Sequence, residues 1–91
     1  MQEKLLLRVL LPANGTIYEF RVPTTMTSGQ VAGLISQILA SRERARYEPS
    51  YDAELMYAEG AHAGRLVDRH KTFRSLACGN YVVSGSLLVL V

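Results

Sequence analysis

The chain has 91 residues, of which 48% are hydrophobic and 20% are charged, and its formal net charge is +2. A chain of this length is expected to form one domain, residues 1–91, around a single core. Its one cysteine, Cys78, excludes an internal disulfide and the usual multi-cysteine zinc or iron–sulfur site. No stretch approaches the ~18–20 apolar residues of a membrane span, and no signal peptide is visible. We therefore expect a soluble, cytoplasmic domain that does not insert into a membrane.

Basic residues are concentrated in two segments, 42–46 and 65–74. They are Arg42, Arg44 and Arg46, followed by Arg65, Arg69, Lys71 and Arg74. The net charge is too small to indicate a nucleic-acid partner, and the aromatic-rich basic motifs of RNA-binding domains are absent. We expect solvated loop charges and no nucleic-acid partner.

Two runs near the amino terminus predict a β-hairpin. They are KLLLRVLL (Lys4–Leu11) and TIYEFRV (16–22), separated by the turn residues Ala13, Asn14 and Gly15. In the second run Tyr18, Phe20 and Val22 alternate with polar residues, which predicts that they point inward. In the first run Arg8 marks the outer face together with Leu6 and Leu10. The inward residues are then Leu5, Leu7, Val9 and Leu11.

The segment TSGQVAGLISQILASRER predicts the one clear helix of the chain. Thr27 and Gln30 have the spacing of a capping box. The apolar residues recur at helical spacing and are expected to cover the inner face of the hairpin: Val31, Leu34, Ile35, Ile38 and Leu39.

The second half predicts shorter elements. RARYEPSYD reads as a loop containing Pro49, residues 54–58 as a strand and residues 65–67 as a short edge strand. A short helical turn should follow with Phe73 and Leu76 inward, and the chain should turn at Ser84 and Gly85 into a final, central strand. The predicted class is α+β with the order β-β-α-β-β-β, in which a mixed sheet of four to five strands packs on one helix. A long crossover through that helix would let the last strand lie parallel to the first.

This arrangement is the β-grasp, and several segments resemble ubiquitin-like proteins. They are TSGQVAGLI, ELMYAEG, GRLVDRHKTFRSL and GSLLVLV. More narrowly, TIYEFRVPTTMTSGQVAGLISQIL and YVVSGSLLVLV resemble the YukD/EsaB family and the ubiquitin-like amino-terminal domain of EccD, both of type VII (ESX) secretion. The segment 41–52 is longer and more basic than that family implies.

The resemblance also bears on whether the chain is expected to form covalent conjugates or to act as an enzyme. Ubiquitin and the β-grasp sulfur carriers end in a flexible Gly-Gly tail, whereas this sequence ends at Val91 inside a predicted strand. We therefore expect no covalent conjugation. Hydrolase, metalloprotease and phosphate-loop motifs are absent, so we expect a protein that is not an enzyme and has no cofactor or metal.

The resemblance implies protein binding through the outer face of the sheet. Alternation in the last strand, read as Leu87, Val89 and Val91 facing the helix, turns Leu88 and Leu90 outward. Together with Met56 and the charged neighbour Arg8, these two leucines form the expected partner site. The alternatives are a homo-oligomer contact or cover by the loop 42–52.

The functional hypothesis is a non-conjugated adaptor that binds a protein partner in the assembly or regulation of type VII secretion. One alternative is the amino-terminal module of a longer membrane component. The other is a small, non-catalytic β-grasp subunit of a bacterial multicomponent enzyme such as a monooxygenase.

Overall fold

The computed structural model describes residues 4–42 and 53–91, and these residues contain six helices and strands. In chain order they are β1 (Lys4–Leu11), β2 (Thr16–Pro23), α1 (Ser28–Arg42), β3 (Leu55–Tyr57), α2 (Phe73–Cys78) and β4 (Ser86–Leu90). The α+β class and the mixed sheet on one main helix are confirmed. The predicted loop around Pro49, including Arg44 and Arg46, lies outside the described residues.

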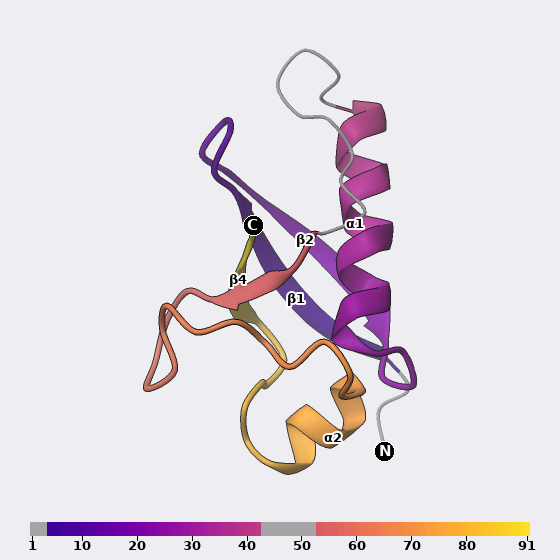
Figure 1. Cartoon of the computed structure of the whole chain (residues 1–91), viewed down its shortest axis with the longest axis vertical. Helices are drawn as coiled ribbons and strands as arrows, with labels where there is room; N and C mark the ends of the chain where they lie inside the picture. The colour runs from indigo at the N-terminus through magenta and orange to yellow at the C-terminus, as the bar shows by residue number, and fades with distance from the viewer. Residues whose placement is uncertain (1–3, 43–52) are drawn as a thin grey trace.

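The four strands form one sheet in the order β2-β1-β4-β3 (Figure 1). β1 and β2 pair antiparallel over their full length, from Lys4 opposite Pro23 to Leu11 opposite Thr16. β4 lies parallel to β1 and antiparallel to β3. The final strand is therefore central, as predicted, and the crossover between β1 and β4 includes α1. Figure 1 shows α2 at the end of the sheet far from the β1–β2 turn.

Side chains of β1 and β2 alternate between the two faces as the sequence predicts. Every second residue of β1, from Leu5 to Leu11, is buried in the core. In β2, Val22 is buried, and Tyr18 and Phe20 pack against the same core. The intervening residues of both strands therefore lie on the opposite face, which is called the outer face below.

α1 begins at the predicted capping box. The backbone N–H of Gln30 donates to Thr27 Oγ1 at 3.2 Å, and the backbone N–H of Thr27 donates to Gln30 Oε1 at 3.0 Å. The predicted stripe is only partly correct. The buried residues of α1 are Ser28, Val31, Ala32, Ile35, Ser36, Leu39 and Ala40.

Leu34 and Ile38, two members of the predicted core stripe, are instead 47% and 43% exposed. Ala32, Ser36 and Ala40 are buried, although they were not part of the predicted stripe. Leu34 and Ile38 therefore form an apolar pair on the surface of α1.

The segment after β3 is less regular than predicted. The expected edge strand over 65–67 reduces to a single bridge between Met56 and Leu66. α2 then begins at Thr72, whose Oγ1 accepts a hydrogen bond from the N–H of Ser75 at 3.2 Å. Phe73 and Leu76 are buried in the core, as predicted.

Candidate functional site

The side chains of β4 alternate between the two faces in the opposite phase to the prediction. Leu88 is fully buried and Leu90 is 3% exposed, and both belong to the core. Leu88 lies opposite Val9 in β1 and opposite Tyr57 in β3, both of which are inward residues. The expectation that Leu88 and Leu90 face outward is therefore wrong, and these two residues cannot contact a partner in the folded chain.

Val89 takes the outward position instead. It lies opposite Leu10 of β1 and opposite Met56 of β3, and it is absent from the core cluster. The outward placement of Met56 and of Arg8 is as predicted, because both alternate with buried neighbours along their strands. Two of the four expected site residues thus share the outer face.

A continuous apolar row crosses the outer face. Pairing runs from Ile17 to Leu10, from Leu10 to Val89, from Val89 to Met56, and from Met56 to Leu66. Partners in a ladder point to the same side of a sheet, so these five side chains form one line, called the outer row below. With a strand spacing of about 4.8 Å, the row is about 19 Å long.

Exposure varies along the outer row. Its ends, Ile17 and Leu66, are 48% and 52% exposed, whereas Val89 at its centre is 8% exposed. Each row member is shielded by its cross-strand neighbours, so the centre is covered from both sides. A partner can therefore bury apolar surface at both ends of the row, with Leu10 and Met56 half-buried between them.

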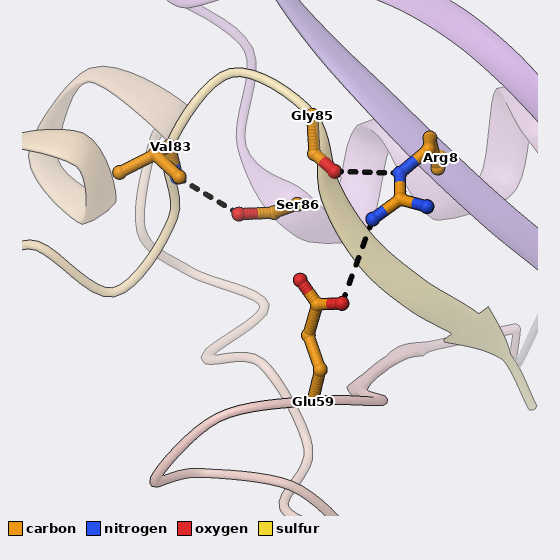
Figure 2. Close-up of polar contacts among 5 residues, drawn as sticks. All are labelled: Arg8, Glu59, Val83, Gly85 and Ser86. Carbon is orange, nitrogen blue, oxygen red and sulfur yellow. Dashed lines mark hydrogen bonds and ion pairs between the residues drawn. The ribbon is translucent and has the colours of Figure 1, made fainter.

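Arg8 lies on the outer face one step from the row, where its side chain contacts Gly85 and Glu59 (Figure 2). Its Nε donates to the carbonyl oxygen of Gly85 at 2.7 Å, and its Nη2 lies 3.5 Å from Glu59 Oε1. Ser86, next to Gly85, accepts a hydrogen bond on its Oγ from the N–H of Val83 at 2.9 Å. Arg8 therefore joins β1 to the turn before β4.

Three basic residues of the two predicted segments lie beside an aromatic ring or a carboxylate. The guanidinium of Arg42 lies 5.9 Å from the centre of the Tyr18 ring, and Arg69 forms an ion pair with Glu54 at 3.9 Å. Lys71 Nζ lies 5.9 Å from the centre of the Tyr81 ring. These three basic side chains therefore each have an aromatic or acidic neighbour.

An aromatic group covers the turn after β3. The His62 ring lies between Tyr57 and Tyr81, with ring centres 5.6 and 4.9 Å apart. Burial raises the pKa of the Tyr57 hydroxyl above its usual value, with smaller contributions from Tyr81 and Asp68. This hydroxyl is consequently held in its neutral form.

Residues 4–42 and 53–91 offer neither a metal site nor a membrane span. No three of their His, Cys, Asp or Glu side chains lie together as a metal site requires, and none of the described helices is long and apolar enough to cross a membrane. The outer face is the feature of the described residues with the clearest capacity to bind another molecule.

Sequence reasoning missed three members of the outer row as site residues: Ile17, Val89 and Leu66. Ile17 could have been found from the alternation in the second strand of the hairpin, just as Leu10 was placed on the outer face in the first strand. Leu66 had no clear signal, because alternation with the charged Arg65 would have placed it inward, whereas the structure buries Val67 instead. Val89 had no local signal, because apolar residues surround it on both sides.

The same geometry occurs in known proteins. No protein-family model matches the chain, and no curated protein matches it significantly. Solved structures do match. Ubiquitin from Caldiarchaeum subterraneum is 22% identical over 96% of this chain and 90% of that chain, with a TM-score of 0.62. The chain has the ubiquitin-like β-grasp fold.

Two further structures have the same fold. A ubiquitin-like domain from Arabidopsis thaliana is 17% identical, covering 99% of this chain and 78% of that chain, with a TM-score of 0.63. A chain of the MycP5-free ESX-5 inner membrane complex is 11% identical with a TM-score of 0.74. The match covers 99% of this chain but only 21% of the ESX-5 chain. At these identities the likeness establishes the fold alone.

Proposed function

We propose that this chain is a ubiquitin-like adaptor that binds a protein partner non-covalently, without conjugation, in the assembly or regulation of a type VII secretion apparatus. The outer row is the single observation that carries the proposal. Ubiquitin-like domains commonly bind proteins, and their fold is generally non-catalytic. The proposed site consists of the outer row, including Met56, with Arg8 as its charged neighbour.

The shape of the row supports binding to a protein. The two exposed ends of the row and the half-buried Leu10 and Met56 between them offer contacts to an element with regularly spaced apolar residues, such as a strand or an amphipathic helix. The exposed ends at Ile17 and Leu66 provide most of the surface that a partner would cover. Arg8 is already bonded to Gly85 and Glu59, so its role is to hold the turn and to flank the row.

The secretion assignment is supported by the likeness to a chain of the ESX-5 inner membrane complex. The same observation favours a second candidate, in which this sequence is one module of a longer membrane component, because the match covers 21% of the ESX-5 chain. A genomic reading frame that continues into apolar spans would support the second candidate. A reading frame confined to this sequence would support the adaptor.

The proposal is tested by affinity capture from native cells with three forms of the chain. The site variant is Ile17→Asp/Leu66→Asp. The control is Leu34→Asp/Ile38→Asp, which places the same two charges at similarly exposed apolar positions on α1. Thermal unfolding first establishes that both variants are folded.

We expect wild type and the α1 variant to retain a component of the secretion membrane complex, and the site variant to lose it. Retention by the site variant would contradict the binding site. Equal loss by both variants would contradict it as well. Capture of oxygenase subunits in place of secretion components would overturn the secretion assignment.

A further inference from the structure

Three basic side chains gather at the end of the hairpin that is far from its turn. Lys4 lies opposite Pro23, and Arg21 lies opposite Leu6, so Lys4 and Arg21 are diagonal neighbours on the outer face. Diagonal neighbours in an antiparallel pair are about 7–8 Å apart. Arg74, at the start of α2, completes the group, which is called the basic corner below.

Two hollows adjoin at the basic corner, and Lys4 lines both. The first, of about 220 Å³, is lined by Lys4, Leu6, Arg21 and Ser84. The second, of about 310 Å³, is lined by Lys4, Pro23, Thr24, Thr25 and Arg74. Each hollow thus combines cationic side chains with hydroxyl groups and an apolar wall.

The charges of the basic corner are not neutralised by the described residues. Lys4, Arg21 and Arg74 make no ion pair with any residue in 4–42 or 53–91, whereas Arg8 and Arg69 are paired with Glu59 and Glu54. Glu19 is the acidic neighbour of Arg21 on the same face of β2, and it lies opposite Arg8 in the ladder. Lys4 and Arg21 carry like charges as diagonal neighbours and therefore repel each other. An anionic ligand would offset this repulsion.

We propose that the basic corner binds carboxylate side chains of an acidic segment. Glutamate and aspartate match the hollows because each has a short apolar stem, which Leu6 or Pro23 can contact, and a charged end. An arginine can bind a carboxylate through two parallel hydrogen bonds. The cations border hollows rather than a flat surface, which suits projecting side chains better than a membrane.

The basic corner is continuous with the outer row, which defines the partner further. Leu6 lies between Lys4 and Arg8 on the same face of β1, and Leu10 belongs to the row. Four to six residues along a strand correspond to about 13–20 Å between the corner and the row. The partner proposed above would therefore carry acidic residues about that far from its apolar anchors. This last step rests on the proposed function, whereas carboxylate binding at the corner does not.

The proposal is tested with an oligoglutamate peptide titrated into the isotope-labelled chain and followed by amide chemical shifts. An oligoglutamine peptide of equal length is the uncharged control. Inorganic phosphate and vesicles of phosphatidylglycerol with phosphatidylcholine are titrated separately. We expect saturable shifts around Lys4, Arg21 and Arg74 with oligoglutamate only, and weaker binding as salt is raised.

Variants locate the binding. Lys4→Gln/Arg21→Gln should weaken oligoglutamate binding about two- to thirty-fold, the range expected for the loss of two exposed charge pairs. Arg42→Gln/Arg65→Gln removes the same charge elsewhere and should change the affinity less than about two-fold. Equal weakening in both variants, or tighter binding of phosphate or vesicles than of oligoglutamate, would overturn the proposal.

The row variant Ile17→Asp/Leu66→Asp separates this proposal from the proposed function. It should bind oligoglutamate with no more than modest weakening, because each added carboxylate lies in the row and not in the basic corner. If the basic corner fails this test while the row variant still loses its partner in cells, only the carboxylate site is wrong. If oligoglutamate binds and the row variant keeps its partner, only the function through the row is wrong.

Discussion

Arg8 Nε donates a hydrogen bond of 2.7 Å to the carbonyl oxygen of Gly85, and the N–H of Gly85 donates to the carbonyl oxygen of Leu6 at 2.8 Å. β1 therefore holds Gly85 through both its backbone polar groups. Gly85 has φ 91°, a left-handed conformation that favours glycine. The turn enters β4 at a position from which Leu88 faces the core and Val89 faces outward.

The conformation of this turn gives a first prediction. Gly85→Ala should destabilise the fold by about 1–2 kcal/mol, because alanine is strained at a positive φ. A Cβ at Gly85 would have no atom within 4 Å, so the cost comes from the backbone and not from a clash. Urea unfolding measures the change in the free energy of unfolding.

Gly33→Ala is the matched control for Gly85→Ala. Gly33 lies inside α1, and a Cβ added there would also have no atom within 4 Å, but its φ is not positive. Alanine there should stabilise the fold by about 0.5–1 kcal/mol through its higher helix propensity. A neutral Gly85→Ala would show that the turn does not constrain the start of β4.

A second prediction tests whether Leu88 faces the core and Leu66 faces solvent. Leu88→Ala should cost about 2–5 kcal/mol because it opens a cavity in the core. Leu66→Ala should change stability by no more than about 0.5 kcal/mol, since Leu66 is exposed. Similar losses in both variants, measured by urea unfolding, would contradict the placement of Leu88 inside.

The sequence allowed the hairpin, the capping box of α1 and the fold class to be predicted, because each has a local signal. The apolar residues of β1 and β2 are interrupted by Arg8, Glu19 and Arg21, and these charged residues show which face of each strand is exposed to solvent. The last strand has no such marker, since residues 87–91 are all apolar. Its phase depends on the turn at Gly85 and on pairing with β1.

The sequence also did not show which residues of α1 are buried. Leu34 and Ile38 have the spacing of a core stripe, but Ala32, Ser36 and Ala40 are buried while Leu34 and Ile38 are exposed. Hydrophobicity alone ranks leucine above serine for burial, so the burial of Ser36 could not be predicted from the residue type. Two of the four expected site residues, Arg8 and Met56, lie on the outer face as predicted. The charge of Arg8 and the strand alternation around Met56 indicated this face.

A third prediction concerns high pH. The raised pKa of Tyr57 means that the folded chain keeps this proton at a pH where the unfolded chain loses it. The stabilisation is fully present below about pH 10, the unfolded value, and is lost as the pH rises through the folded value. Tyr57→Phe has no such proton, so its melting temperature should fall less steeply than that of wild type above pH 10. Parallel curves would contradict the role of Tyr57.

A fourth prediction separates the two contacts of Arg8. Glu59→Gln should cost no more than about 0.5 kcal/mol, because the ion pair is exposed and 3.5 Å long. Arg8→Met keeps an apolar stem but removes the hydrogen bond to Gly85, and should cost about 1–2 kcal/mol. Urea unfolding of both variants measures the difference. Equal costs would indicate that the ion pair, and not the bond to Gly85, is the important contact.

Occupation of the outer row by a protein partner is tested most directly by site-specific photo-cross-linking in cells. A photoreactive phenylalanine derivative is placed at Leu66 or Ile17 in the row, or at Leu34 or Ile38 on α1. We predict that the two row positions cross-link to the same secretion-complex component and that the α1 positions do not. Cross-links to that component from α1 alone, or equally from both surfaces, would contradict binding through the row.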